Sequence, residues 1–204
     1  MEHRVVVTGM GAVTPVGNSA TETWDAFIAG KNGIGAITRF DTTDFKVKVA
    51  GEVKDLDCAE QLGCNTRHMD LFVQYALVAA DEAIAQAGLD AEGSCDRDRV
   101  GVYVGSGIGG MKSYTDNVDV MRARGARRVS PFMIPMMIAN MAAGEIAIRQ
   151  KLYGPTLPVV TACATSAHTI GEAFRAIKHG YADAIVAGGS EGALVPEAVA
   201  GFTN

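Results

Sequence analysis

A lone cysteine, Cys163, stands where an apolar run ends and a helical pattern begins, in LPVVTACATSAH at residues 157–168. A strand followed directly by a helix places this thiol at the helix N-terminus, where unpaired backbone N–H groups and the helix dipole stabilise a thiolate. A thiolate there is a nucleophile, and the same amides can form part of an oxyanion hole for a thioester carbonyl. Flanking Ala162 and Ala164 leave room for a substrate. On pattern alone, a buried and inert cysteine is the alternative.

A glycine pattern, Gly105-x-Gly107-x-x-Gly110, follows a predicted strand and matches the dinucleotide fingerprint. That fingerprint needs a helix and then a second strand with an acidic residue for the ribose. The corresponding stretch reads MRARGARRVSPF, with arginines and no strand pattern. Arginines can bind a 2'-phosphate, so an NADP enzyme stays open as an alternative.

The earlier G-M-G at residues 9–11 has no third glycine, and we interpret it as a tight turn between a strand and a loop.

Basic side chains gather at MRARGARR, residues 121–128, which holds Arg122, Arg124, Arg127 and Arg128. The 204 residues carry a formal net charge of −5, and this excludes the dominant basic face of a nucleic-acid-binding protein. The arginines therefore form either a solvated loop or a local binding patch. With 48% hydrophobic residues, the chain can bury a sizeable core as one domain or as part of a larger one.

The four cysteines contain no C-x-x-C pair, so neither a zinc site nor a disulfide framework is predicted for Cys58, Cys64, Cys95 and Cys163. The first residues lack the basic start and long apolar middle of a signal peptide. No run reaches the roughly 18 to 20 apolar residues of a membrane span. We expect a protein of the reducing cytoplasm with no metal, no membrane and no nucleic acid among its partners.

The elements that must position these residues are predicted from hydrophobic patterns. Continuous apolar runs suit strands buried on both faces of a parallel sheet, at residues 4–11, 99–107, 157–162 and 182–192. Helical spacing covers residues 70–87 before Gly88, part of 135–151, and the stretch from Cys163 to Gly180. In the last of these, one side is expected to be apolar: Ala167, Ile170, Ala173, Phe174 and Ile177. Alternating strands and helices predict a layered α/β fold.

Four stretches together resemble the 3-oxoacyl-[acyl-carrier-protein] synthases, particularly the elongating type II enzyme. They are VVVTGMGAVTPVG at the start, VGSGIGG in the middle, VVTACATSAHTIGEAFRAIKHG around Cys163 and AIVAGGSEG near the end. The resemblance implies a thiolase-like fold, an internally duplicated α-β-α-β-α sandwich that works as a homodimer. It also implies that residues 1–204 are most of the N-terminal half of that duplication, a ketoacyl synthase domain.

The resemblance implies a condensation in which Cys163 accepts an acyl group from an acyl carrier protein as a thioester, with its backbone N–H as an oxyanion donor. Malonyl carrier protein is then decarboxylated, and its carbanion attacks the acyl group, extending the fatty acid by two carbons without a metal or redox cofactor. In this family Ile108 matches the gate of the acyl pocket and Phe202 an aromatic beside it, while Met133, Ile134 and Met137 lie near the acyl tunnel. The resemblance also implies that Arg124, Arg127 and Arg128 bind the acidic carrier protein, with Arg67 as a weaker companion.

The sequence departs from the family in one respect, because the second half of the family's fold supplies two histidines and a lysine whose motifs are absent here. None of the four histidines, His3, His68, His168 and His179, lies in such a context. His168 is five residues past Cys163, about 140° around the helix, so it is expected at the surface. A half-fold of this kind should also leave apolar surface exposed.

Two further functions share these motifs. A polyketide-type ketosynthase differs mainly in its substrate. A non-condensing partner subunit would only dock carrier protein and shape the tunnel, and the intact Cys163 argues against it because such subunits generally lack the nucleophile.

Overall fold

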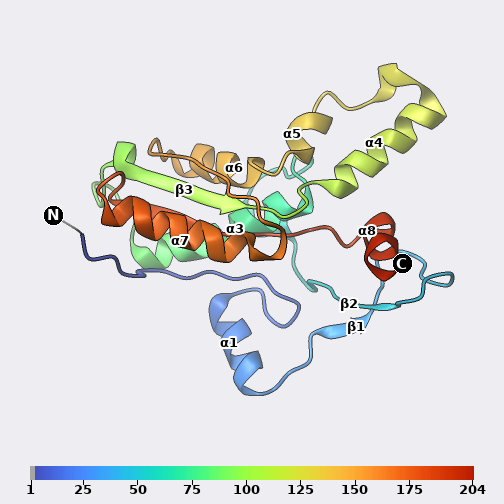
Figure 1. Ribbon diagram of the computed structural model, residues 1–204, viewed down its shortest axis with the longest axis horizontal. Helices are drawn as coiled ribbons and strands as arrows, with labels where there is room; N and C mark the ends of the chain where they lie inside the picture. The colour runs from blue at the N-terminus through green and yellow to red at the C-terminus, as the bar shows by residue number, and fades with distance from the viewer. Residues whose placement is uncertain (1–2) are drawn as a thin grey trace.

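Residues 3–204, the part of the chain that the computed structural model describes, form eight helices and four short strands (Figure 1). The helices are α1 (Ala20–Ile28), α2 (Cys58–Leu62), α3 (Leu71–Ala87), α4 (Met111–Arg124), α5 (Met133–Met137), α6 (Met141–Gln150), α7 (Thr165–Lys178) and α8 (Pro196–Thr203). The strands are β1 (Ile34–Ala36), β2 (Val49–Gly51), β3 (Val100–Gly105) and β4 (Ala184–Gly189), and the short 3-10 turns are η1 (Arg97–Arg99), η2 (Ala126–Arg128) and η3 (Ala162–Ala164). None of these helices is both long and apolar enough to span a bilayer.

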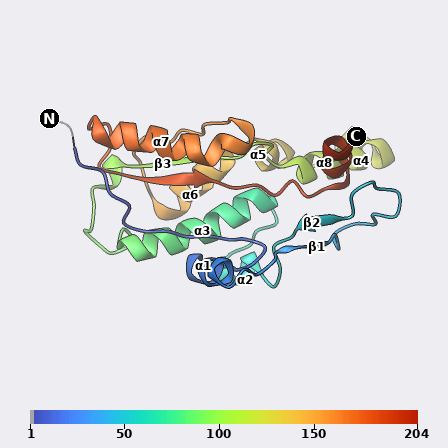
Figure 2. The ribbon, with the colours of Figure 1, turned by 60° about the horizontal axis from the view of Figure 1, so that its bottom comes forward.

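The central layer is the parallel pair of β3 and β4, in register from Val100 opposite Ala184 to Gly105 opposite Gly189. Helix α7 packs on one face of this pair, and α3 and α6 pack on the other (Figure 2). The predicted layered α/β arrangement is confirmed. Every residue of β3 is buried, as its continuous apolar run predicted, whereas most of β4 is only half-buried.

The core lies between the pair of strands and helices α3 and α6. Its fully buried side chains include Phe72, Leu77 and Ile146. Helix α3 begins and ends within a residue of its predicted bounds, because Gly88 takes the left-handed conformation, φ 67°, that closes a helix. The second predicted helix, within residues 135–151, is divided into α5 and α6.

Residues 4–11 do not form the predicted strand. Their backbone crosses α3 and bonds to its side chains, with Met10 N donating to Gln86 Oε1 at 2.6 Å. No strand of the described chain pairs with them, and Val7 is 80% exposed. Gly9 and Gly11 lie so close to α3 that a Cβ on either would overlap a backbone oxygen of the helix. The two glycines therefore permit close packing on α3, and the prediction of a simple tight turn was wrong.

Residues 157–162 also fail to form the predicted strand. The segment starts beside β3, where Leu157 N donates to Val102 O at 3.1 Å and Thr156 forms a single parallel bridge with Val102. Beyond this bridge the segment makes no regular ladder with β3. The segment stays close to β3 because Gly105 has no side chain, and a Cβ there would overlap the carbonyl oxygen of Val159.

Helix α7 turns a different face to the sheet from the one predicted. Its buried residues are small, namely Thr165, Thr169, Ala173 and Ala176, whereas Ile170 is 52% and Phe174 48% exposed. Small side chains let the helix approach the sheet, and Thr169 Oγ1 donates to Gly188 O at 2.7 Å. The large apolar residues consequently point outward, which agrees with the expected exposure of apolar surface.

Several elements were not predicted at all: α1, the antiparallel pair β1 and β2, α2, α4 and α8.

Near the start of the central layer, Arg99 Nη2 and Asp183 Oδ1 form an exposed ion pair at 2.8 Å. The hydrogen bond from Arg99 holds the pKa of Asp183 below its ordinary value.

Candidate active site

Cys163 lies in the turn η3, directly before α7, and its side chain is exposed. Residue Ala162 takes the left-handed conformation, φ 52°, which is strained for a residue that has a Cβ. Thr161 N donates to Thr165 Oγ1 at 2.9 Å, and Thr161 Oγ1 lies 2.8 Å from His168 Nδ1. Hydrogen bonds that link Thr161, which precedes the turn, to Thr165 and His168 on α7 therefore fix the turn that presents Cys163.

The same edge of the sheet gathers the loops that follow β3 and β4, because the carboxyl ends of parallel strands meet at one edge. A pocket of about 610 Å³ opens there, and Cys163, Ile108 and Phe202 all line it. Its wall is mostly apolar or small and includes Val53, Ala162, Leu194, Ala198 and Val199. Three residues predicted from separate parts of the sequence are thus brought around one cavity.

Glycines explain how these loops come so close together. A Cβ on Gly105 would overlap the Val159 carbonyl oxygen, and one on Gly107 would lie 3.1 Å from Glu191 Oε2 and 3.2 Å from Ala162 O. The G-x-G-x-x-G pattern therefore serves the approach of β3 and its loop to the cysteine turn. Helix α4 follows it, but the described chain has no strand between Gly110 and β4, so the dinucleotide-binding unit does not form.

Sequence reasoning missed two polar residues of the pocket, Glu191 and Ser106. Much of Glu191 stays open to solvent, yet its carboxylate points into the pocket, where burial raises its pKa despite hydrogen bonds from Ser106 and nearby backbone N–H groups. The available signal was position alone, because both residues lie at the carboxyl ends of predicted parallel strands, at residues 99–107 and 182–192, where ligands bind in such folds. The described residues hold no cluster of three or more His, Cys, Asp or Glu side chains that could bind a metal.

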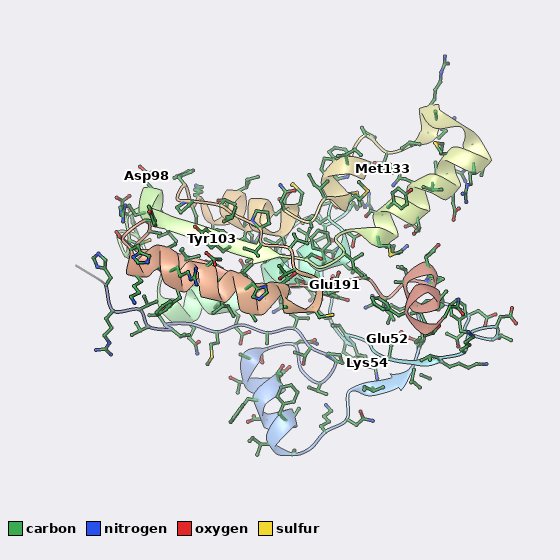
Figure 3. The ribbon with its side chains drawn as sticks, viewed as in Figure 1. Glu52, Lys54, Asp98, Tyr103, Met133 and Glu191 are labelled. Atoms are coloured by element: carbon green, nitrogen blue, oxygen red, sulfur yellow. The ribbon has the colours of Figure 1, made fainter. Side chains whose placement is uncertain are left out.

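The predicted tunnel residues Met133, Ile134 and Met137 do not line the pocket. All three lie on α5, and Figure 3 shows Met133 apart from Glu191. Helix α5 nevertheless contacts the loop that carries Ile108, since Gly110 N donates to Met137 O at 2.9 Å.

The predicted docking arginines are exposed, and all of them except Arg67 lie in helical turns, not in a loop. Arg124 ends α4, while Arg127 and Arg128 belong to η2, and α4 projects away from the sheet (Figure 1). Arg67 lies before α3, and its neighbour His68 stacks on Phe132 with ring centroids 3.9 Å apart. His168 is exposed, as expected.

Residues 2–204 match the family model of the beta-ketoacyl synthase N-terminal domain. The chain belongs to the beta-ketoacyl synthase family. It is 46% identical over 204 residues to the 3-oxoacyl-[acyl-carrier-protein] synthase 2 of Synechocystis sp., covering 100% of this chain and 49% of the relative. The protein of the same name from Staphylococcus aureus (strain N315) is 45% identical over 201 residues, which are 98% of this chain and 48% of the relative. The chain therefore spans about half the length of these curated relatives.

Solved structures of ketosynthases resemble the whole chain. A beta-ketoacyl synthase from Burkholderia phymatum STM815 superposes with a TM-score of 0.84 at 30% identity, over 100% of this chain and 50% of that one. The ishigamide ketosynthase/chain length factor gives 0.89 at 28% identity, over 100% and 51%. A type II PKS acyl-carrier protein in complex with its ketosynthase, bound to the hexaketide, gives 0.83 at 27% identity, over 100% and 55%. The predicted thiolase-like fold is confirmed.

Proposed function

We propose that the chain is the acyl-accepting part of a 3-oxoacyl-[acyl-carrier-protein] synthase that elongates fatty acids by two carbons. The observation that carries the proposal is the exposed thiol of Cys163, placed at the start of α7 and facing the same pocket as Ile108 and Phe202. A nucleophile beside a mostly apolar cavity fits an acyl chain that must be both bound and covalently held.

In the first half-reaction the Cys163 thiolate attacks the thioester carbonyl of the acyl carrier protein, and the carrier's thiol leaves. Negative charge develops on the carbonyl oxygen, so backbone donors aimed at it lower the barrier. Within residues 3–204, the backbone N–H of Cys163 donates to no acceptor of the chain, which leaves it available to that oxygen. The strained Ala162 and the bonds at Thr161 keep this donor and the thiol in one arrangement.

The second half-reaction, decarboxylation of malonyl carrier protein and attack on the acyl group, needs further donors aimed at the developing enolate. The pocket holds none of the chain's histidines, and the curated relatives are about twice as long as the chain. We therefore assign the acyl transfer to this chain and the complete condensation to the whole protein.

We further propose that carrier protein docks on the exposed arginines Arg124, Arg127 and Arg128, with Arg67 as a weaker companion. Their exposure at the end of α4 supports this assignment, as does the neighbouring ketosynthase structure that includes an acyl-carrier protein. Two other exposed cations, Lys31 and Lys46, offer a matched control for a pair of these arginines, because they carry the same charge. Lys31 follows α1, and Lys46 lies between β1 and β2. Dimer formation, a cytoplasmic location and an acyl tunnel along α5 stay predictions.

A polyketide-type ketosynthase is the second candidate, and the neighbouring ketosynthase in complex with a type II PKS acyl-carrier protein favours it. Its identity of 27% is well below the 45% and 46% shared with the two 3-oxoacyl-[acyl-carrier-protein] synthase 2 relatives, so we prefer fatty-acid elongation. The presence of Cys163 also disfavours a non-condensing partner subunit.

The test is condensation by the natural full-length protein, supplied with acyl and malonyl carrier proteins and followed by mass spectrometry of the carrier-bound product. The wild type is expected to form the 3-oxoacyl carrier protein and Cys163→Ala to form none. Cys95→Ser is the matched control, because Cys95 is half-buried and does not line the pocket. Equal product from Cys163→Ala and wild type would reject the proposed role of the thiol.

A further inference from the structure

We propose that Glu191 is a positioning residue that fixes the loop of residues 106–110, and through it the pocket wall formed by Ile108. This inference rests on the proposed function for its meaning, since Ile108 matters only if the pocket takes an acyl chain. Glu191 and the loop come from different strands, β4 and β3, and meet where both strands end (Figure 3).

A chain of hydrogen bonds links Glu191 to the loop. One carboxylate oxygen, Oε2, accepts from Ile108 N at 3.1 Å, and the other, Oε1, lies 3.1 Å from Ser106 Oγ. Ser106 Oγ in turn accepts from Gly109 N at 2.9 Å, so the serine hydroxyl hydrogen is free to point at Glu191. Glu191 thus binds the backbone N–H of Ile108 directly and that of Gly109 through Ser106.

The loop is held from the opposite side as well. Gly110 N donates to Met137 O at 2.9 Å, which attaches the end of the loop to α5. Between these two attachments stands Ile108, 41% exposed and lining the pocket. Moving Ile108 out of the pocket therefore requires the bonds to Glu191 to break, while the attachment to α5 can act as the pivot.

A carboxylate is better suited to this task than an amide. Both oxygens of an ionised glutamate accept hydrogen bonds, and both partners here, Ile108 N–H and Ser106 O–H, are donors. In Glu191→Gln the side chain keeps its shape but loses its charge, and one acceptor becomes an NH₂ group. Ser106 Oγ must then turn its hydrogen away and accept from that NH₂, so both attachments become weaker, neutral hydrogen bonds.

Hydrogen exchange tests the attachment without any assumption about activity. In the natural full-length protein, the amides of Ile108 and Gly109 are expected to exchange about tenfold faster in Glu191→Gln than in wild type, because hydrogen bonds to a charged acceptor are replaced by weaker ones to a neutral amide. Ser106→Ala is expected to speed exchange at Gly109, whose acceptor it removes, and this covers the case that Glu191→Gln folds poorly. The matched control is Glu52→Gln, since Glu52 lines the same pocket but accepts from Thr38 and Arg39 instead. Unchanged exchange at Ile108 and Gly109 in both test variants would overturn the inference.

Chain-length selectivity tests the consequence. With Ile108 released, the ratio of short-chain to long-chain acyl transfer from carrier protein onto Cys163 is expected to fall in Glu191→Gln and equally in Ser106→Ala. Combining the two substitutions should add nothing, because both act through one loop. The alkylation rate of Cys163 by iodoacetamide should stay as in wild type, which a general loss of structure would not allow.

The outcomes separate this inference from the proposed function. A wild-type protein that accepts no acyl group from carrier protein would contradict the proposed function, and the exchange measurement would still decide whether Glu191 holds the loop. A wild type that is acylated, with a selectivity ratio that neither substitution changes, would overturn the positioning role alone.

Discussion

Replacing Ser113 with alanine should loosen the arm formed by α4 and η2, which carries the proposed docking arginines. Ser113 is the buried residue of α4, and both its backbone N and its Oγ donate to Asp70 Oδ2, at 3.0 and 2.6 Å. Asp70, which precedes α3, is 4% exposed. These two bonds therefore join the first turn of the projecting arm to the helix at the centre of the core.

The expected cost follows from the chemistry of this contact. A buried hydrogen bond from a hydroxyl to a carboxylate contributes about 2 kcal/mol, and its loss leaves a buried oxygen poorly satisfied. The other oxygen, Asp70 Oδ1, already has no partner within the described residues, so the carboxylate has no alternative donor nearby. A change of about 2 kcal/mol raises the population of a locally opened arm roughly 30-fold.

Hydrogen exchange resolved by peptide provides the assay. Amides of α4 should exchange roughly 30-fold faster in Ser113→Ala, while those of α3 and β3 stay close to wild type, because the arm opens without unfolding the core. Thr115→Ala is the control, since Thr115 Oγ1 donates within the helix, to Lys112 O at 3.1 Å. Exchange in α4 that matches the control, or equal acceleration across the whole chain, would refute the reasoning.

Three further predictions concern docking, packing and pH. The double substitution Arg127→Glu and Arg128→Glu should weaken binding of acyl carrier protein at low salt more than the control substitution Lys31→Glu with Lys46→Glu does. Equal effects would refute the docking site. Gly105→Ala should lower the midpoint of thermal unfolding and slow alkylation of the pocket cysteine, because its methyl group must displace the segment before that cysteine; unchanged values would contradict this. The lowered pKa of Asp183 stabilises the fold above the ordinary aspartate value of 3.8, and this stabilisation disappears as pH falls through the lowered pKa. The thermal midpoint of Asp183→Asn should therefore lie below that of wild type at neutral pH, with the gap closing as the pH falls from 3.8 through the lowered pKa, and a constant gap would contradict the assignment.

The sequence predicted best those elements whose own residue pattern matches their burial and their ends in the fold. Strand β3 is a continuous apolar run that is buried throughout, and α3 has both helical spacing and Gly88 at its end. Helix α1 had a usable signal too, since Ser19 caps it by accepting from Glu22 N in the S-x-x-E pattern of a capping box.

Residues 4–11 and 157–162 could not be predicted correctly from their own composition, because a strand exists only when another strand pairs with it. The buried face of α7 could not be predicted from hydrophobicity either. There, close packing on the glycine-rich end of β4 favours small side chains such as Thr169 over Ile170.

The site was predicted in part. Cys163, Ile108 and Phe202 were identified through the resemblance, and all three line one pocket. Glu191 was missed because its importance comes from hydrogen bonds to residues about 85 positions away in the sequence. Such contacts depend on the parallel pairing of β3 and β4, which no local pattern specifies.

The central claim is that Cys163 accepts an acyl group from acyl carrier protein. The most direct measurement incubates the natural full-length protein with a medium-chain acyl carrier protein and locates the added mass by peptide mass spectrometry. The account predicts one acyl thioester, on the peptide that contains Cys163, which hydroxylamine removes and which Cys163→Ala does not form. An unmodified Cys163 peptide, or acylation that persists in Cys163→Ala, would contradict the account.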